Sequence, residues 1–468
     1  MSDLPFLSAT EQARLVRGGD ISPVELVETY LSRVEKLDGE LNAYVTVAGD
    51  QALGQARDAE ARVGRGEDLP PFHGVPIAIK DLAETRGLRT TFSTKAAKDY
   101  VPRLDAASVR RIKEAGFIVL GKTNTPEFGT LPITESELNG ACHNPWDLDR
   151  TPGGSSGGAA AALAAGLTPI AHGSDGGGSI RIPASCCGVF GIKPSRGRVS
   201  SAPRFGEVWE GFSTEGPIAR SVSDAAALLD VMSGYETGDP YWAPPPERPF
   251  ADEVGRAPGP LRVAFTGETP NGAPVDSAVL GALEDAGRLL ESLGHEIEEA
   301  SPDWVDHDMV AAYIKVVQAS PALVPLPEEG MEPINRALLQ AADQLSSADY
   351  VRAMTTLHSF ARKVVAFWDD YDLLLTPTLA LPPVPIGWLF EDDDPWMQLT
   401  RSGFFIPFTP PFNITGQPAA SLPLYWSDGG LPIGVQLVGR PADEATIIRV
   451  AAQLEAARPW ADRRPPVS

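Results

Sequence analysis

The sequence predicts an α/β fold: a single large domain in which a central, mixed and twisted β-sheet is covered by helices on both faces. Three observations predict it. Short apolar runs end in polar residues or glycine, helical segments lie between these runs, and the runs recur in both halves of the chain. Strands that alternate with helices are typical of a sheet with helices on both faces. Because strands recur on both sides of the middle, we expect one domain over residues 1–468.

The first element is a helical cover over residues 1–70. Ser22-Pro23-Val24-Glu25 has the form of a capping box with proline at the first helical position. Apolar residues then recur at helical spacing, namely Leu26, Val27, Tyr30, Leu31 and Val34. We expect this face to pack on the sheet.

From residue 75 the pattern changes to buried strands. The predicted strands are 75–79, 117–120, 168–171, 261–265, 296–299, 373–375 and 433–437, the last closing the sheet late in the chain. Helices are predicted at 108–115 and in the alanine-rich segment 158–165. Proline-rich 238–260 is expected to be an exposed connector, and 382–411, which mixes proline with aromatic residues, a structureless pocket wall or lid.

Composition excludes several classes of protein. The net charge of −23 disfavours nucleic acid and anionic membranes as partners. The six histidines and three cysteines show no metal-ligand spacing, so we expect neither a metal nor a cofactor. An odd number of cysteines suits a reducing compartment, and with no apolar segment of membrane-spanning length and no signal-peptide pattern a cytoplasmic location is expected.

Two glycine- and serine-rich segments are candidates for chemistry. The segment 153–158 satisfies the G-x-S-x-G pattern of a nucleophile elbow, but a proline-bounded loop precedes it where that motif needs a strand. The segment 175–181 instead follows a predicted strand and places three glycines before Ser179. Their N–H groups are suited to an oxyanion hole, which makes Ser179 the candidate nucleophile. Taken alone, a glycine-rich turn after a strand is more often structural than catalytic, so the structural interpretation stays open at this point.

A serine nucleophile needs a base, and Lys80 is the candidate. It ends the predicted strand 75–79, and a lysine that is buried there can lose its proton and act as a base near neutral pH. The competing interpretation is an exposed lysine paired with Asp81.

A family resemblance favours the catalytic interpretation. Taken together, several motifs resemble the amidase signature family in order and spacing: Gly74–Asp81, Gly121–Phe128, Asn144–Asp147, Gly153–Gly158, Gly173–Pro183, Cys187–Pro194, Asn413–Ala419 and Gly430–Gly439. The resemblance covers nearly the whole chain apart from residues 240–410, where the match is sparse. It implies a catalytic core at 71–235, a variable substrate-shaping region at 240–410 and C-terminal closure of the sheet at 411–468.

The resemblance implies a Ser-cisSer-Lys triad and its supporting residues. Ser179 matches the acylated serine, Ser155 the bridging serine on a cis peptide bond, and Lys80 the base. By the same match, the oxyanion hole is formed by N–H groups of Gly176, Gly177, Gly178 and Ser179, and the supporting residues are Ser156, Asp175 and Arg181. Gly176 departs from relatives that carry a larger residue such as threonine, so a roomier turn is expected there.

The implied function is hydrolysis of a C–N bond, other than a peptide bond, in a small amide or carbamate through an acyl-enzyme. The segments 173–198 and 206–211 look most like bacterial 6-aminohexanoate-cyclic-dimer hydrolases, aryl acylamidases and urethanases. The expected substrate-binding residues are Asn139, Trp209, Phe404 and Phe405. Alternatives are the glutaminase subunit of a tRNA-dependent amidotransferase and a non-catalytic scaffold; a homodimer is left open.

Overall fold

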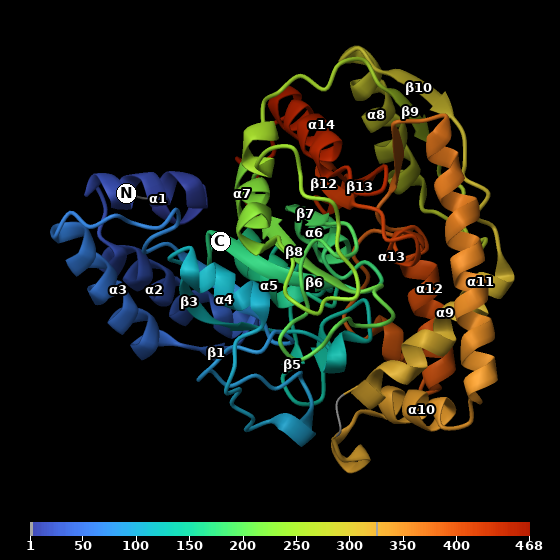
Figure 1. Cartoon of the computed structure of the whole chain (residues 1–468), viewed down its shortest axis with the longest axis horizontal. Coiled ribbons are helices and arrows are strands. Elements are labelled where there is room, and N and C mark those ends of the chain that lie inside the picture. The colour runs from blue at the N-terminus through green and yellow to red at the C-terminus, as the bar shows by residue number, and fades with distance from the viewer. Residues whose placement is uncertain (1–2, 324–325) are drawn as a thin grey trace.

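The computed structural model describes residues 3–323 and 326–468, and its centre is a mixed sheet of 11 strands (Figure 1). In spatial order the strands are β1 (Tyr44–Val47), β3 (Ile118–Thr123), β2 (Pro76–Lys80), β6 (Ile170–Asp175), β8 (Thr214–Ala219), β7 (Phe190–Lys193), β12 (Ala419–Trp426), β13 (Pro432–Gly439), β11 (Leu373–Pro377), β9 (Arg262–Phe265) and β10 (Glu296–Glu299). A separate hairpin joins β4 (Glu135–Ser136) to β5 (Gly140–Ala141).

The sheet is parallel in two places and antiparallel between them. β2 pairs in parallel with β3 and β6, and β9 pairs in parallel with β10 and β11. The central strands β8, β7, β12 and β13 pair antiparallel, as does β1 at one edge. The prediction of a mixed sheet is therefore confirmed.

Helices cover both faces of this sheet, as predicted. They are α1 (Ala9–Gly18), α2 (Pro23–Leu41), α3 (Gly49–Gly64), α4 (Ala107–Glu114), α5 (Gly157–Ala164), α6 (Arg181–Cys187), α7 (Val222–Met232), α8 (Ser277–Ser292), α9 (His307–Ala319), α10 (Pro333–Ala342), α11 (Ser347–Val365), α12 (Pro395–Phe405), α13 (Pro411–Ile414) and α14 (Glu444–Ala457). None of the helices in residues 3–323 and 326–468 combines the length and apolar character needed to cross a membrane.

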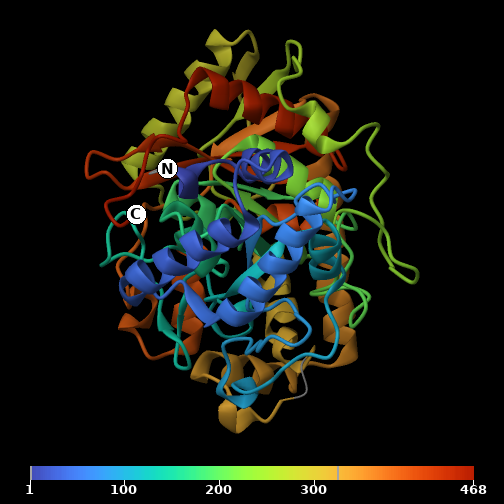
Figure 2. The ribbon, with the colours of Figure 1, turned by 90° about the vertical axis from the view of Figure 1, so that its left-hand side faces the viewer.

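Alternation along β2 shows how the two faces are filled. Ile77 and Ile79 belong to the core cluster that includes residues of α4, α7, α8 and α14, whereas Ala78 belongs to the cluster that includes residues of α2, α3 and α5. Because successive side chains in a strand point to opposite faces, Lys80 follows Ala78 onto the face that α5 covers. Figures 1 and 2 show α1–α3 at one side of the sheet and α9–α12 at the opposite side.

The N-terminal cover and the aromatic segment differ from their predictions. The first 70 residues are not wholly helical, because Tyr44–Val47 forms the edge strand β1. The segment 382–411 is not structureless, since it contains α12, which begins at Pro395 with the Asp394 side chain accepting from the N–H of Trp396 at 3.0 Å. An N-cap aspartate before a proline is a recognised helix start, so this signal was present in the sequence.

Candidate active site

Lys80 lies at the end of β2 with its side chain fully buried. Its Nζ donates to Ser155 Oγ at 2.7 Å and to Ser174 Oγ at 3.0 Å. Burial lowers the pKa of Lys80 to about 7, against the opposing negative charges of Asp175 and Glu215. A lysine in this environment is available as a neutral amine near physiological pH.

Asp81 does not pair with Lys80, so the competing interpretation of an exposed ion pair is wrong. The Asp81 carboxylate turns to Thr91, whose backbone N–H donates to it at 3.0 Å and whose Oγ1 also donates to it. Both Lys80 and Asp81 are fully buried. The lysine therefore hydrogen-bonds to Ser155 and Ser174 rather than to a carboxylate.

The loop before α5 carries Ser155 and Ser156. The peptide bond between Gly154 and Ser155 is cis, and Ser156 occupies the N-cap position of α5. Ser156 Oγ donates to the carbonyl of Ser174 at 3.2 Å, and its N–H donates to the carbonyl of Ser179 at 3.1 Å. These two bonds hold the serine loop against the glycine-rich turn, on the same side as Lys80.

A buried ion pair between Asp175 and Arg181 holds the glycine-rich turn in place. Arg181 donates to both carboxylate oxygens of Asp175, at 2.8 and 2.9 Å, and the same carboxylate accepts from the N–H of Gly178 at 2.8 Å and of Ile180 at 3.2 Å. The Asn413 amide donates to it at 2.9 Å. Although burial by itself raises the pKa of Asp175, the charge and hydrogen bonds of Arg181 hold that pKa well below its usual range.

This arrangement decides which N–H groups of the turn are available to a substrate. The N–H of Gly178 is engaged by Asp175, so it differs from the other three members of the predicted oxyanion hole. Within the described residues, the N–H groups of Gly176, Gly177 and Ser179 donate to no other group. Three donors rather than four therefore remain for a developing oxyanion.

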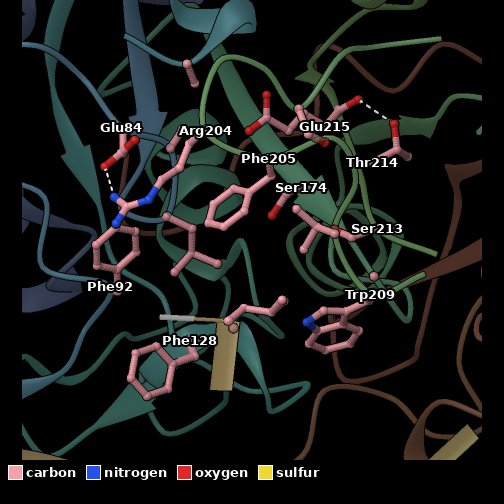
Figure 3. Close-up of a pocket in the computed structure, with 18 of the residues that line it drawn as sticks. Glu84, Phe92, Phe128, Ser174, Arg204, Phe205, Trp209, Ser213, Thr214 and Glu215 are labelled. Carbon is pink, nitrogen blue, oxygen red and sulfur yellow. Dashed lines mark hydrogen bonds and ion pairs between the residues drawn. The ribbon is translucent and has the colours of Figure 1, made fainter. Parts of the chain in front are cut away.

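Two cavities meet at Ser179. We call the first the relay cavity: it contains Ser155, Ser174 and Gly176 and has a volume of about 160 Å³. Figure 3 shows Phe92, Phe128, Phe205 and Trp209 around this space. The second, the aliphatic cavity, contains residues of α9 and of the segment 399–411 and has a volume of about 140 Å³. Gly129, Ser179 and Trp209 line both.

Of the four predicted substrate-binding residues, the structure brings only Trp209 to the cavities. Phe405 is fully buried in a core cluster, and Phe404 is 46% exposed on the other side of its helix, so neither lines the relay or the aliphatic cavity. Asn139 lies in the β4–β5 hairpin, where its Nδ2 donates to Ser93 Oγ at 2.9 Å. Phe404 and Phe405 lie away from both cavities because aromatic content alone does not show which face of α12 meets them, whereas Asn139 lies away from them in the hairpin.

Two contributors to the site were not predicted. Ser174 is the second hydroxyl in contact with Lys80, and Asn413 ties α13 to Asp175. Both lie inside motifs that resemble the amidase signature, Gly173–Pro183 and Asn413–Ala419, so the sequence shows their positions but not their contacts. Among residues 3–323 and 326–468, no group of three or more His, Cys, Asp or Glu side chains is placed to hold a metal ion.

Comparisons with known proteins identify the family of this chain. A family model described as Amidase matches residues 25–448. The chain is 40% identical to a 6-aminohexanoate-cyclic-dimer hydrolase from Paenarthrobacter ureafaciens, over 98% of this chain and 96% of that protein, and 36% identical to an acylamidase from Rhodococcus erythropolis, over 99% and 98%. A solved structure of 6-aminohexanoate cyclic dimer hydrolase in complex with substrate superimposes with a TM-score of 0.93 at 39% identity, covering 99% of each chain. With the motifs, the mixed sheet and the Lys80–Ser155 contact in place, these matches show that the chain belongs to the amidase family, the amidase signature enzymes that its motifs resemble.

Proposed function

We propose that this enzyme hydrolyses the C–N bond of a small, hydrophobic amide or carbamate, with Ser179 as nucleophile, Ser155 as proton relay and Lys80 as base. The observation that carries the proposal is the 2.7 Å contact between Lys80 Nζ and Ser155 Oγ, made by a buried lysine whose pKa is about 7. A base with a pKa near the working pH transfers protons efficiently in both directions.

The proposed acylation step uses this contact together with Ser179, which lines the relay cavity beside Ser155. Neutral Lys80 accepts the proton of Ser155 Oγ while Ser155 takes the proton of Ser179, whose oxygen attacks the substrate carbonyl carbon. The carbonyl oxygen gains the negative charge and accepts from the N–H groups of Gly176, Gly177 and Ser179. When the C–N bond breaks, the leaving nitrogen takes a proton from Ser155, which Lys80 then reprotonates.

Deacylation repeats the same transfers with water. Water loses a proton to Ser155 and so to Lys80, and its oxygen attacks the ester carbonyl on Ser179. The ester bond breaks, Ser179 recovers a proton from Ser155, and the acid leaves. A carbamate follows the same course, because its carbonyl carbon also bears the nitrogen that departs.

The cavity linings and the relatives support the substrate class. Aromatic and aliphatic side chains surround Ser179 on both sides, which suits a hydrophobic substrate. The relatives include a 6-aminohexanoate-cyclic-dimer hydrolase and an acylamidase, both named for amide substrates. We therefore extend non-peptide amide hydrolysis to this chain.

Replacing the nucleophile tests the proposal. Ser179→Ala is expected to abolish hydrolysis of aryl amides and carbamates and to prevent labelling by a fluorophosphonate probe, measured by intact mass. Ser292→Ala, at an exposed serine in the last turn of α8, is the matched control and should label and turn over as wild type. Retention of amide hydrolysis by Ser179→Ala, or labelling at another serine alone, contradicts the assignment.

A further inference from the structure

Trp209 stands at the boundary between the relay and aliphatic cavities, beside Ser179. Among the residues that the structure describes, three line both cavities: Trp209, Ser179 itself and Gly129, which has no side chain. We propose that Trp209 is a specificity-determining partition that keeps the amine part of the substrate in the relay cavity and the acyl part in the aliphatic cavity. This inference rests on the proposed acyl-enzyme mechanism.

The proton path decides which cavity takes which part of the substrate. Ser155 lines the relay cavity and not the aliphatic one. Because the leaving nitrogen must receive its proton from Ser155, the amine lies in the relay cavity. The acyl carbon stays bonded to Ser179 Oγ, so the rest of the acyl group extends to the other side of Trp209, into the aliphatic cavity.

The two linings differ in chemistry although the cavities are similar in volume. The relay cavity carries Phe92, Phe128 and Phe205, together with the Glu84–Arg204 ion pair, which suits a planar aromatic amine (Figure 3). Met309 and Ile406 are typical of the aliphatic cavity, which suits a branched or alicyclic acyl group. The substrate class that fits both is the amide of an arylamine with an aliphatic acid.

The Trp209 ring rests directly on the glycine-rich turn. A Cβ at position 176 would lie 3.0 Å from the indole Cε3 and 3.1 Å from its Cζ3, closer than such contacts normally come. Gly176 therefore does not leave the roomier turn that the sequence suggested, because the indole occupies that space. The indole ring of Trp209, which comes from another loop, fills the space that a side chain at position 176 would occupy.

The backbone around Trp209 has an unusual conformation that positions the indole ring. Trp209 and Glu210 have φ of 57° and 54°, the left-handed region that non-glycine residues rarely adopt. The Gly211 N–H donates to Glu207 at 2.6 Å and Tyr350 Oη donates to Glu210 at 2.6 Å, and these bonds anchor both sides of the turn. Strain of this kind persists where surrounding contacts enforce it, and here they fix a side chain against the nucleophile turn.

The test uses four amides in a two-by-two set: acetyl and cyclohexanecarbonyl amides of aniline and of 1-aminonaphthalene. In wild type, the change in kcat/KM on enlarging both groups should equal the product of the two separate changes to within about twofold, as for independent sites. Trp209→Ala removes the wall between the cavities, so a large group in one cavity takes space from the other. In this variant kcat/KM for the substrate with both large groups should differ about tenfold from that product, a range typical of steric discrimination. Trp209→Phe, which keeps an aromatic wall, should restore most of the independence.

Two variants that touch one cavity each test the orientation. Phe205→Ala alters the relay cavity alone and should change the amine preference, whereas Met309→Ala alters the aliphatic cavity alone and should change the acyl preference. The reverse pattern, or independence that survives in Trp209→Ala, overturns the partition while Ser179-dependent hydrolysis still stands. Loss of the proposed function itself is recognised separately, by amide hydrolysis that persists in Ser179→Ala.

Discussion

Lys80→Met replaces a buried amine by an apolar side chain of similar length, so it separates the amine's role in catalysis from its effect on stability. With a pKa of about 7, Lys80 is neutral in half of the molecules at pH 7. A lysine at the ordinary pKa of about 10.4 would be neutral in roughly one molecule in 2,500. Burial therefore raises the reactive fraction about a thousandfold at neutral pH.

The same shift predicts a pH-dependent change in stability. Between about pH 7 and pH 10 the unfolded chain binds a proton at Lys80 that the folded chain does not, so the stability of wild type rises with pH in this window. At low pH this pKa shift lowers the stability of folded wild type by about 4–5 kcal/mol, a penalty that Lys80→Met removes. The variant leaves the serine hydroxyls that contacted Lys80 without a partner, which costs about 1–3 kcal/mol. We therefore expect Lys80→Met to raise the free energy of unfolding by about 1–4 kcal/mol at or below pH 7, and this gain to fall with pH and become a loss near pH 10.

Two measurements check this expectation: kcat/KM for an anilide from pH 5 to 10, and urea unfolding over the same range. Wild-type kcat/KM should rise with pH and level off above about pH 7. Lys80→Met should lose about 10²–10⁴-fold, as expected when a general base is removed.

Lys122→Met is the matched control. Lys122 on β3 is also buried, and burial lowers its pKa to about 8. It lies outside the site, where its Nζ donates to Thr85 Oγ1 at 3.0 Å. It should alter stability and leave the acid limb of the rate profile near pH 7. A Lys80→Met enzyme with the wild-type rate and limb, or a limb that disappears in Lys122→Met, would refute the assignment of the base.

Three further predictions concern Ser155 and the glycine-rich turn. Ser155→Ala removes the bridging hydroxyl and should lower kcat/KM by about 10²–10⁴-fold with an unchanged circular dichroism spectrum; a rate near that of wild type would remove Ser155 from the relay. Arg181→Met leaves the fully buried Asp175 carboxylate without its ion-pair partner and should cost about 3–5 kcal/mol in urea unfolding, so a loss below 1 kcal/mol would contradict the account. Gly178→Ala places a side chain at φ 127° and should lower Tm and activity together, whereas Gly281→Ala on α8, with open space around it, should keep both; equal effects would show that the turn tolerates a side chain.

Much of the fold was predictable from local patterns. The predicted strands 75–79, 117–120 and 433–437 lie within or next to β2, β3 and β13, because buried strands in a sheet covered on both faces are short apolar runs. The strands β7, β8 and β12 were not predicted. They contain glycine, proline or charged residues such as Lys193 and Glu215, which become tolerable in a buried strand only through partners from elsewhere in the chain.

The candidate catalytic residues were also predictable, because chemistry that needs glycines, serines and a lysine leaves a dense local signature. Lys80 and Ser155 were named from their motifs, and the structure brings them to 2.7 Å. The substrate-binding residues could not be chosen in this way. Phe404 and Phe405 are adjacent, yet one faces solvent and the other the core, because a helix turns about 100° per residue.

The sequence by itself determined much of the strand and helix pattern, the family and the residue types of a serine–lysine site. Only the tertiary structure decided which N–H groups of the turn are free, that Lys80 is buried, and that Trp209 fills the space beside Gly176. The reason is physical: propensity and periodicity act over a few residues, whereas desolvation, hydrogen-bond partners and the shape of a cavity arise from segments far apart in the chain.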